Sequence, residues 1–378
     1  MGPLSGLKIV EFAGIGPGPF AGMLLADLGA EIIRIDRKQA SGLGLQRPRQ
    51  FDYALRSRKT IRIDLKSAGG TELALKLADQ ADGLLEGFRP GVMERLGLGP
   101  DVCLARNPKL VYGRLTGWGQ TGPLAPAVGH DLNYIAITGA LHAMGRAGEP
   151  PAIPLNLLGD YAGGSLYLII GMLSALLEAR RSGKGQVVDA AIVDGVASLS
   201  TQLYGMMRAG LLNQERGTNH IDSGAHFYEV YECADGKWVS IAPVEDKFYQ
   251  QLLKVLELDI ATPQLDRAGW PAAKVKIAQR IRTKTRAEWA ALLEGTDVCF
   301  APVLDLEEAT EHPHMRARGA YVEVAGELQP APAPRFSRTV PDKPTAGEMV
   351  GSPEGLRAAL QDWLPVQDVV DAIEAGIV

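Results

Sequence analysis

Apolar runs of strand length alternate with helical patterns along the first part of the chain, and this alternation constrains the fold more than any other feature. The helical patterns cover residues 20–28 and 71–80, each between two apolar runs. The runs themselves lie at residues 7–12, 31–35, 83–86 and 110–115. Strands that alternate with helices in this way form a parallel sheet with helical crossovers. We therefore predict an open α/β domain.

The pattern changes in the second half of the chain. Two β-type runs, residues 227–233 and 237–243, flank an Asp-Gly turn and predict a hairpin. Charged helical segments follow, and the proline-rich stretch 329–334 is typical of a linker. We expect a large α/β domain over residues 1–200, to which residues 330–378 return, and a smaller α+β domain over residues 220–325.

The composition describes a globular chain that needs neither a disulfide nor a metal for stability. It has 378 residues, 46% of them apolar, which is enough for two hydrophobic cores. The three cysteines, Cys103, Cys233 and Cys299, form no Cys-x-x-Cys pair. Their odd count and wide spacing argue against a disulfide framework or a zinc ribbon, and favour a reducing cytoplasm.

Neither the first residues nor the most apolar run reads as a targeting or membrane segment. The first residues lack the basic and apolar regions of a signal peptide. The most apolar run, residues 166–177, is shorter than the ~20 residues that a membrane-spanning helix needs. It falls within a helical pattern over residues 165–181, so we expect a buried helix in a soluble, cytoplasmic protein with no membrane span.

Positive charge is concentrated in one segment of an otherwise acidic chain. The net charge of −5 argues against nucleic-acid binding. Residues 34–62 nevertheless hold nine basic and only two acidic side chains. Because arginine forks match phosphate oxygens, this basic island indicates a compact, multiply charged anion as ligand. A solvated helix or loop face would give the same composition, and charge alone does not separate the two interpretations.

The 44 glycines gather in four clusters, which are typical of turns or of close backbone approach. The clusters cover residues 14–22, 113–122, 159–164 and 183–185. In the first, residues 16–21 fit the dinucleotide fingerprint G-x-G-x-x-A, with Asp36 beyond it. However, Pro17 and Pro19 remove backbone N–H groups that a pyrophosphate would need. We interpret this loop as a turn, and the fourth cluster as a helix end.

His130 differs in context from the other five histidines. No histidine pair has zinc-ligand spacing, so we expect no metal site. His130 follows the glycine-rich stretch 117–123 and precedes a helical pattern that begins at Leu132. A helix N-terminus favours the neutral imidazole that a general base requires. A capping or packed histidine fits the same context.

Asp160 lies thirty residues further on, between an apolar run and the long helical pattern. An aspartate in this place is a natural helix N-cap. It is also a candidate catalytic acid or nucleophile, because Gly163 and Gly164 would let a ligand approach the backbone closely. The spacing alone does not choose between these roles.

Taken together, these blocks resemble the family III CoA-transferase superfamily and, within it, the α-methylacyl-CoA racemases. The block Gly-His-Asp-x-Asn-Tyr at residues 129–134 is the racemase-like part. The other matching blocks lie at residues 7–37, 64–67, 86–91, 117–123, 156–164, 185–189 and 333–338. The resemblance implies a doubly wound, Rossmann-like large domain that binds CoA, a small domain, and a homodimer whose two chains are interlocked.

The resemblance also implies the site residues. His130 and Asp160 would be the two acid/base residues on opposite faces of the substrate α-carbon, and Glu245 of the partner subunit would hydrogen-bond the histidine. No cofactor beyond the CoA moiety of the substrate is implied, since the thioester itself acidifies the α-proton. The implied CoA contacts are Arg37, Ile63, Asp64, Leu65, Lys66, Gly87, Phe88, Arg89, Arg95, Gly129, His130, Asp131, Leu132, Asn133 and Tyr134.

The expected activity is the interconversion of (2R)- and (2S)-2-methylacyl-CoA thioesters. Inversion needs a proton removed from one face of the α-carbon and another delivered to the opposite face, so two bases are the simplest solution. The alternative is a CoA-transferase in which Asp160 attacks the thioester as a nucleophile. A noncatalytic CoA-binding scaffold is a third interpretation. The acyl chain and the physiological pathway are not readable from the sequence.

Overall fold

The computed structural model describes residues 2–39, 42, 44, 45 and 47–378, which divide into two compact units. The first unit comprises Met1–Thr138, Pro154–Leu199 and Gly319–Val378, and the second comprises Gly139–Ile153 and Ser200–Arg318. The second unit thus includes the segment 139–153, for which the sequence pattern gives no signal, and its main segment begins at residue 200 rather than at the expected 220.

A seven-stranded sheet within the described residues forms the centre of the first unit, with the strand order β12-β3-β2-β1-β4-β5-β6. Every neighbouring pair is parallel, which confirms the predicted α/β class. Chain order reverses between β1 and β4, so a crevice opens there at the carboxyl ends of the strands. The strands are β1 (Lys8–Phe12), β2 (Glu31–Asp36), β3 (Lys59–Arg62), β4 (Gly83–Glu86), β5 (Val111–Thr116), β6 (Val187–Ala191) and β12 (Glu348–Met349).

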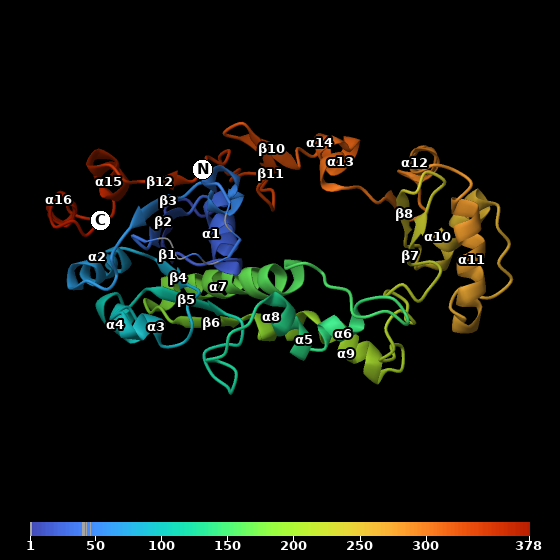
Figure 1. Cartoon of the computed structure of the whole chain (residues 1–378), viewed down its shortest axis with the longest axis horizontal. Coiled ribbons are helices and arrows are strands. Elements are labelled where there is room, and N and C mark those ends of the chain that lie inside the picture. Colours follow the sequence, from blue (N-terminus) through green and yellow to red (C-terminus); the bar gives the residue numbers. More distant parts are fainter. Residues whose placement is uncertain (1, 40–41, 43, 46) are drawn as a thin grey trace. The chain divides into compact units, whose positions relative to one another are not determined.

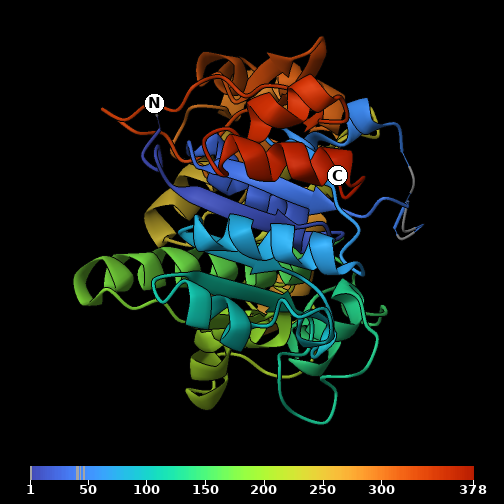
Figure 2. The ribbon, with the colours of Figure 1, turned by 90° about the vertical axis from the view of Figure 1, so that its left-hand side faces the viewer.

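Helices cover both faces of this sheet. On one face, α2 (Ala68–Asp79) and the C-terminal helices α15 (Pro353–Leu360) and α16 (Val366–Glu374) enclose the largest apolar core. Figure 2 views the unit from this side, with α2 in light blue and the C-terminal helices in red. On the other face, α1 (Pro17–Asp27) contacts β2 and β4, and α7 (Tyr167–Ser182) contacts β5 and β6.

The remaining elements of the first unit are short. They are two 3-10 turns, Arg49–Phe51 and Tyr53–Leu55, the helices α3 (Val92–Arg95), α4 (Pro100–Arg106), α5 (Asp131–Ile137) and α8 (Ile192–Leu199), and an antiparallel hairpin of β10 (Tyr321–Val324) and β11 (Glu327–Pro330). Figure 1 labels the helices and strands along the chain. The stretch expected as a proline-rich linker therefore begins inside β11.

The long apolar helix begins earlier than the sequence pattern indicates. A π-helical segment, Leu157–Leu166, continues without a break into α7, so the helix runs for 26 residues from Leu157 to Ser182. Its length and composition would suffice to cross a membrane, and half of its most apolar window is buried within the chain. This is weak evidence for a span, because α7 packs on β5 and β6 and a core helix passes the same test.

Part of the basic island lies inside the first unit, which corrects its interpretation as a ligand site or a solvated face. Arg56 is buried and its Nε donates to Asp27 Oδ1 over 2.9 Å. Arg34 and Arg58 are buried as well, and both pair with the fully buried carboxylate of Glu11. These three arginines neutralise buried acids between α1 and the sheet. The composition of residues 34–62 does not reveal these ion pairs, because the acidic partners, Glu11 and Asp27, lie outside this segment.

Replacing Arg56 with methionine should destabilise the protein strongly. The substitution keeps an apolar chain of similar length but leaves the carboxylate of Asp27 buried without its ion-pair partner. Loss of one member of a buried pair lowers the free energy of unfolding by about 3–5 kcal/mol. Urea denaturation measures this. The matched control is Arg47→Met, which breaks the exposed pair with Asp52 and should cost less than about 1 kcal/mol; equal losses in both variants would contradict the account.

The second unit combines an antiparallel sheet with helices. Strands β7 (Glu229–Glu232) and β8 (Trp238–Ile241) form the hairpin that the sequence predicts, and β9 (Phe300–Pro302) pairs with β8. The core lies around the fully buried Trp289, beside Tyr231 and Ile277. The helices are α6 (Ala140–Ala143), α9 (Thr201–Arg208), α10 (Asp246–Leu256), α11 (Trp270–Ile281), α12 (Arg286–Leu293), α13 (Leu306–Glu311) and α14 (Pro313–Ala317), with a 3-10 turn at Arg267–Gly269.

Candidate active site

A pocket of about 720 Å³ lies at the carboxyl ends of β1, β2, β3 and β4 in the first unit. This is where ligands bind in open α/β sheets. Six of the residues implied as CoA contacts line it: Arg37, Ile63, Asp64, Leu65, Lys66 and Phe88. Its other lining residues are Ala13, Ile35, Asp36, Lys38, Gln39, Val92 and Leu96.

The lining combines three cationic side chains, two carboxylates (Asp36 and Asp64) and apolar groups, a mixture of charged and apolar groups that suits a nucleotide-like ligand. The guanidinium of Arg37 lies 5.8 Å from the centre of the Phe88 ring, and the Arg37 N–H donates to Asp36 Oδ1 over 2.8 Å. Helix α2 begins directly after the lining residues 64–66, where Ser67 caps it by accepting from the Gly70 N–H. Arginine, lysine and a helix N-terminus all favour phosphate groups.

The other implied contacts on this side of the sheet do not line the pocket. Gly87 and Arg89 follow β4 in an exposed loop, and Arg95 ends α3 with its guanidinium beside Gly91. Burial raises the pKa of Tyr134 to about 12, whereas the positive charge of Arg89 acts in the opposite direction. Arg89 and Tyr134 therefore interact electrostatically.

His130 is the N-cap residue of α5, so the helix begins one residue earlier than predicted. Its backbone N–H donates to Asn133 Oδ1 over 3.0 Å, and its carbonyl accepts from the N–H of Asn133 over 2.8 Å. The Tyr134 hydroxyl donates to the carbonyl of Gly129, and its ring packs edge-on against Trp118. These contacts fix the backbone of His130, whereas the residue itself is exposed. Leu132 is also exposed.

Asp160 lies inside the π-helical segment Leu157–Leu166, and the N-cap residue of that segment is Asn156. The N-cap interpretation of Asp160 is therefore wrong. Its backbone N–H donates to Asp131 Oδ2 over 2.6 Å. Burial and, to a smaller extent, the negative charge of Asp131 raise the pKa of Asp160 to about 6, against the opposing effect of a hydrogen bond with Asn156. An aspartic acid with this pKa exchanges protons readily near neutral pH.

His130 and Asp160 lie close together in the first unit. The charge of His130 lowers the pKa of Asp160. Asp131 links the two, since it follows His130 in the chain and accepts from the Asp160 N–H. Asp131 is 7% exposed, and its Oδ1 has no hydrogen-bond partner among the described residues. The sequence places Asp131 among the CoA contacts but gives no sign of this carboxylate pair.

The first glycine cluster, interpreted from the sequence as a turn, also reaches Asp160. Gly16 has φ 66°, and a Cβ there would lie 3.2 Å from Asp160 Oδ2. The Ser165 hydroxyl donates to the carbonyl of Pro17 over 2.8 Å, and Phe20 stacks on Tyr161 at 4.2 Å. The loop therefore packs against the helix that carries Asp160, and glycine at position 16 leaves room beside the carboxylate.

Glu245 lies in the second unit, exposed, as the N-cap residue of α10. Its negative charge raises the pKa of Cys299, after the larger effect of burial. His130 and Asp160 belong to the first unit, so the contact with Glu245 that the resemblance implies stays a prediction. In the part of the chain that the structure describes, no group of three or more His, Cys, Asp or Glu side chains could hold a metal ion.

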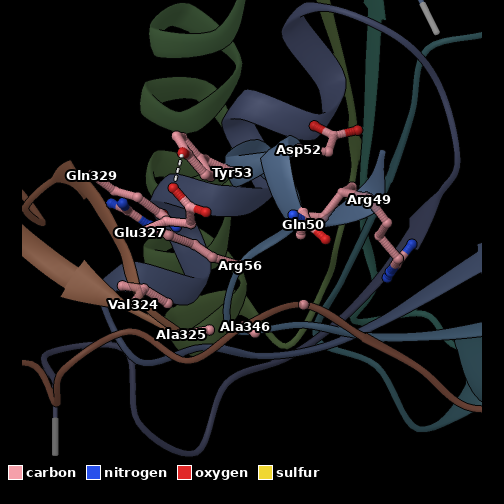
Figure 3. Close-up of a pocket in the computed structure, with 12 residues that line it drawn as sticks. Arg49, Gln50, Asp52, Tyr53, Arg56, Val324, Ala325, Glu327, Gln329 and Ala346 are labelled. Carbon is pink, nitrogen blue, oxygen red and sulfur yellow. Dashed lines mark hydrogen bonds between the residues drawn. The ribbon is translucent and has the colours of Figure 1, made fainter. Parts of the chain in front are cut away.

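A smaller pocket of about 370 Å³ lies between the 3-10 turns and the β10–β11 hairpin (Figure 3). Arg56 and Gln329 lie on one side of it, and the hydroxyl of Tyr53 donates to Glu327 over 3.4 Å. None of the predicted site residues lines it. Because the larger pocket holds six of the implied CoA contacts, we place the candidate CoA-binding site there.

Comparison with known proteins gives the class of the protein. The profile of CoA-transferase family III matches residues 4–354, and the chain therefore belongs to this family. A solved CAIB/BAIF family protein from Brucella suis superimposes with a TM-score of 0.80 at 26% identity, covering 96% of this chain and 99% of that one.

Within the family, the chain is similar to racemases. It is 44% identical over 346 residues to an alpha-methylacyl-CoA racemase of Mus musculus, covering 91% of this chain and 88% of that protein. It is 41% identical over 341 residues to the alpha-methylacyl-CoA racemase of Homo sapiens, covering 89% of this chain and 87% of that protein. The chain is thus an enzyme of CoA-transferase family III, and its similarity to isomerases extends over about nine tenths of its length.

Proposed function

We propose that this enzyme interconverts (2R)- and (2S)-2-methylacyl-CoA thioesters by moving a proton between the two faces of the α-carbon. The observation that carries the proposal is the link from His130 to Asp160 in the first unit, where Asp131, the residue after His130, accepts the Asp160 N–H; the same unit holds the pocket lined by Arg37 and Lys66. The similarity to alpha-methylacyl-CoA racemases supports the substrate class. CoA would bind with its phosphates toward Arg37 and Lys66, and the acyl group would extend toward α5.

In this mechanism one residue removes the α-proton and the other supplies a proton from the opposite face. An ionised Asp160 takes the proton of one enantiomer while a protonated His130 delivers to the other face, and the roles reverse for the mirror-image substrate. The intermediate is an enolate with negative charge on the thioester oxygen. Backbone N–H groups at the start of α5, near Asp131, are the candidate donors to this oxygen.

We further propose that the enzyme is a cytoplasmic, interlocked homodimer of two-domain subunits and needs no cofactor beyond the CoA of its substrate. Exposed apolar side chains on α5, the π-helical segment, α7 and α8 support a contact between copies, because clustered water-exposed apolar surface favours association. They include Ile137, Leu166, Ile170, Leu177 and Leu199. In such a dimer, Glu245 of the partner subunit would orient the imidazole of His130 and stabilise its protonated form.

Incubation of one enantiomer of a 2-methylacyl-CoA in D2O, with no carboxylic acid present, tests the proposed activity. We expect loss of optical purity together with uptake of deuterium at the α-carbon. If the compound keeps its configuration and its hydrogen, and CoA is transferred once a carboxylic acid is added, the racemase proposal fails. That outcome would instead assign Asp160 the role of nucleophile in a CoA-transferase.

The rate should fall at acid pH because Asp160 takes up a proton. Turnover requires one proton shared by His130 and Asp160, so a doubly protonated pair has no base. With the pKa of Asp160 raised to about 6, kcat/KM should fall about tenfold per pH unit below that value. Both enantiomers should give the same profile, since their equilibrium does not depend on pH.

The variant Asp131→Asn tests the cause of this profile. It removes the negative charge that raises the pKa of Asp160, so the acid limb should move to lower pH. Deuterium exchange measured between pH 4.5 and 8, an interval chosen around the pKa of about 6, gives the profile. A rate that stays constant down to the lowest pH, or a limb that does not move in Asp131→Asn, would contradict this account.

A further inference from the structure

The loop after β4 forms one wall of the larger pocket, and strand β5 holds it from behind. Phe88, Val92 and Leu96 of this loop line the pocket. The ring of Phe88 faces the guanidinium of Arg37, which follows β2. The shape of the wall therefore depends on whatever fixes the loop between residues 87 and 96.

Glu86, the last residue of β4, fixes the start of the loop. Its side chain is fully buried. One carboxylate oxygen, Oε2, accepts the N–H of Phe88 over 2.7 Å, and the other, Oε1, accepts Arg114 Nε over 2.9 Å. Burial raises the pKa of Glu86 to about 7, while the Phe88 N–H and the charge of Arg114 oppose this rise. Burial of a carboxylate costs free energy, so packing alone does not explain why Glu86 is buried here.

Arg114, on β5, reaches the far end of the same loop. It is 6% exposed, and its two terminal nitrogens donate to the two carboxylate oxygens of Glu94 in α3, over 2.8 and 3.3 Å. On the same strand, the buried hydroxyl of Tyr112 donates to the carbonyl of Leu98 over 2.8 Å. Arg114 thus links Glu86, at the start of the loop, to Glu94, inside the loop. Only the planar guanidinium of arginine can donate to both carboxylates in this way.

We propose that Glu86 and Arg114 are positioning residues for CoA, which act with Glu94 to hold the loop in the shape that presents Phe88 and Arg89 to the ligand. Neither touches the reacting atoms. The inference rests on the proposed function only in naming CoA as the occupant of the pocket. It adds that affinity for the CoA group depends on a buried ion-pair network behind the pocket wall, whereas proton transfer at the α-carbon does not.

The test measures the Kd of free CoA by calorimetry, and kcat and KM by deuterium exchange into a 2-methylacyl-CoA. In Glu94→Gln, the loop loses its ion pair with Arg114. Kd and KM should therefore rise about threefold to fivefold, while kcat stays within a factor of about two. In Arg114→Lys, a single ammonium replaces the fork, and Kd should rise about tenfold or more with the same small effect on kcat.

Glu72→Gln is a matched control for Glu94→Gln. Glu72 also forms a two-oxygen pair with an arginine, Arg106, on the same unit, and it is similarly exposed, 49% against 44% for Glu94. It lies away from the pocket lining, so Glu72→Gln should leave Kd and KM unchanged. Thermal unfolding of each variant confirms that it is folded at the assay temperature.

The outcomes separate this inference from the proposed function. Unchanged CoA affinity in folded Glu94→Gln and Arg114→Lys would overturn the positioning role, as would an equal loss of affinity in Glu72→Gln. A fall in kcat at unchanged KM would overturn it too. If wild-type protein exchanges no α-proton but binds CoA with the expected dependence on Glu94 and Arg114, the racemase proposal fails and the positioning role stands.

Discussion

Replacing Asp160 with asparagine should lower the rate of racemisation by about 10²–10⁴-fold, the usual contribution of a general acid or base. The amide keeps the size of the side chain and a carbonyl oxygen beside Gly16, but it neither accepts nor delivers the α-proton. Affinity for free CoA should stay near that of the wild type, because Asp160 does not line the larger pocket. Polarimetry of a single enantiomer, with calorimetry of CoA binding, measures both quantities.

The control for this variant is Asp194→Asn, on the neighbouring helix. Asp194 is an exposed carboxylate of α8, which packs against the π-helical segment that carries Asp160. The variant Asp194→Asn should racemise substrate at the wild-type rate. If Asp160→Asn keeps more than about a tenth of the wild-type activity, Asp160 is not one of the two bases, because loss of a general base lowers the rate by more than tenfold.

Replacing His130 with alanine should also lower racemisation by about 10²–10⁴-fold. The main contacts that fix this residue are made by its backbone: its N–H donates to Asn133, and its carbonyl accepts from Asn133 and Tyr134. The variant should therefore fold and bind CoA with little change in Kd, while losing the group that serves the second face of the α-carbon.

The exposed His314 of α14 gives the matched control, since His314→Ala removes an imidazole without touching the first unit. It should be fully active. A His130→Ala variant that loses CoA affinity and kcat in equal measure would show a binding role rather than a proton-transfer role, and one with full activity would exclude both.

The α/β class could be predicted from the sequence because strands β1, β2, β4 and β5 are apolar runs between helical patterns. Strands β3 and β12 could not. Lys59–Arg62 is half charged, and Glu348–Met349 has two residues, so neither shows the apolar run of a buried strand. Both are strands because of pairing with their neighbours, Ile33–Asp36 and Lys59–Thr60, a tertiary effect.

The contacts at Arg37 and Ile63–Asp64 were expected from the family resemblance, and the structure places them in one pocket because they follow the parallel strands β2 and β3. The pairing of Asp131 with Asp160 was not predictable, since the two lie 29 residues apart in the chain and meet through a backbone N–H. The ion pairs of the buried arginines with Glu11 and Asp27 were not predictable either, because the partners also lie far apart in the chain.

The stereochemistry of deuterium uptake by the two single variants tests the central claim, that His130 and Asp160 serve opposite faces of the α-carbon. Each variant keeps one base, which removes and returns the proton on its own face without inversion. Each (2R)- and (2S)-2-methylacyl-CoA is therefore incubated in D2O with each variant. We expect His130→Ala to label one enantiomer and Asp160→Asn to label the other, both with retained configuration. Labelling of the same enantiomer by both variants would contradict the account.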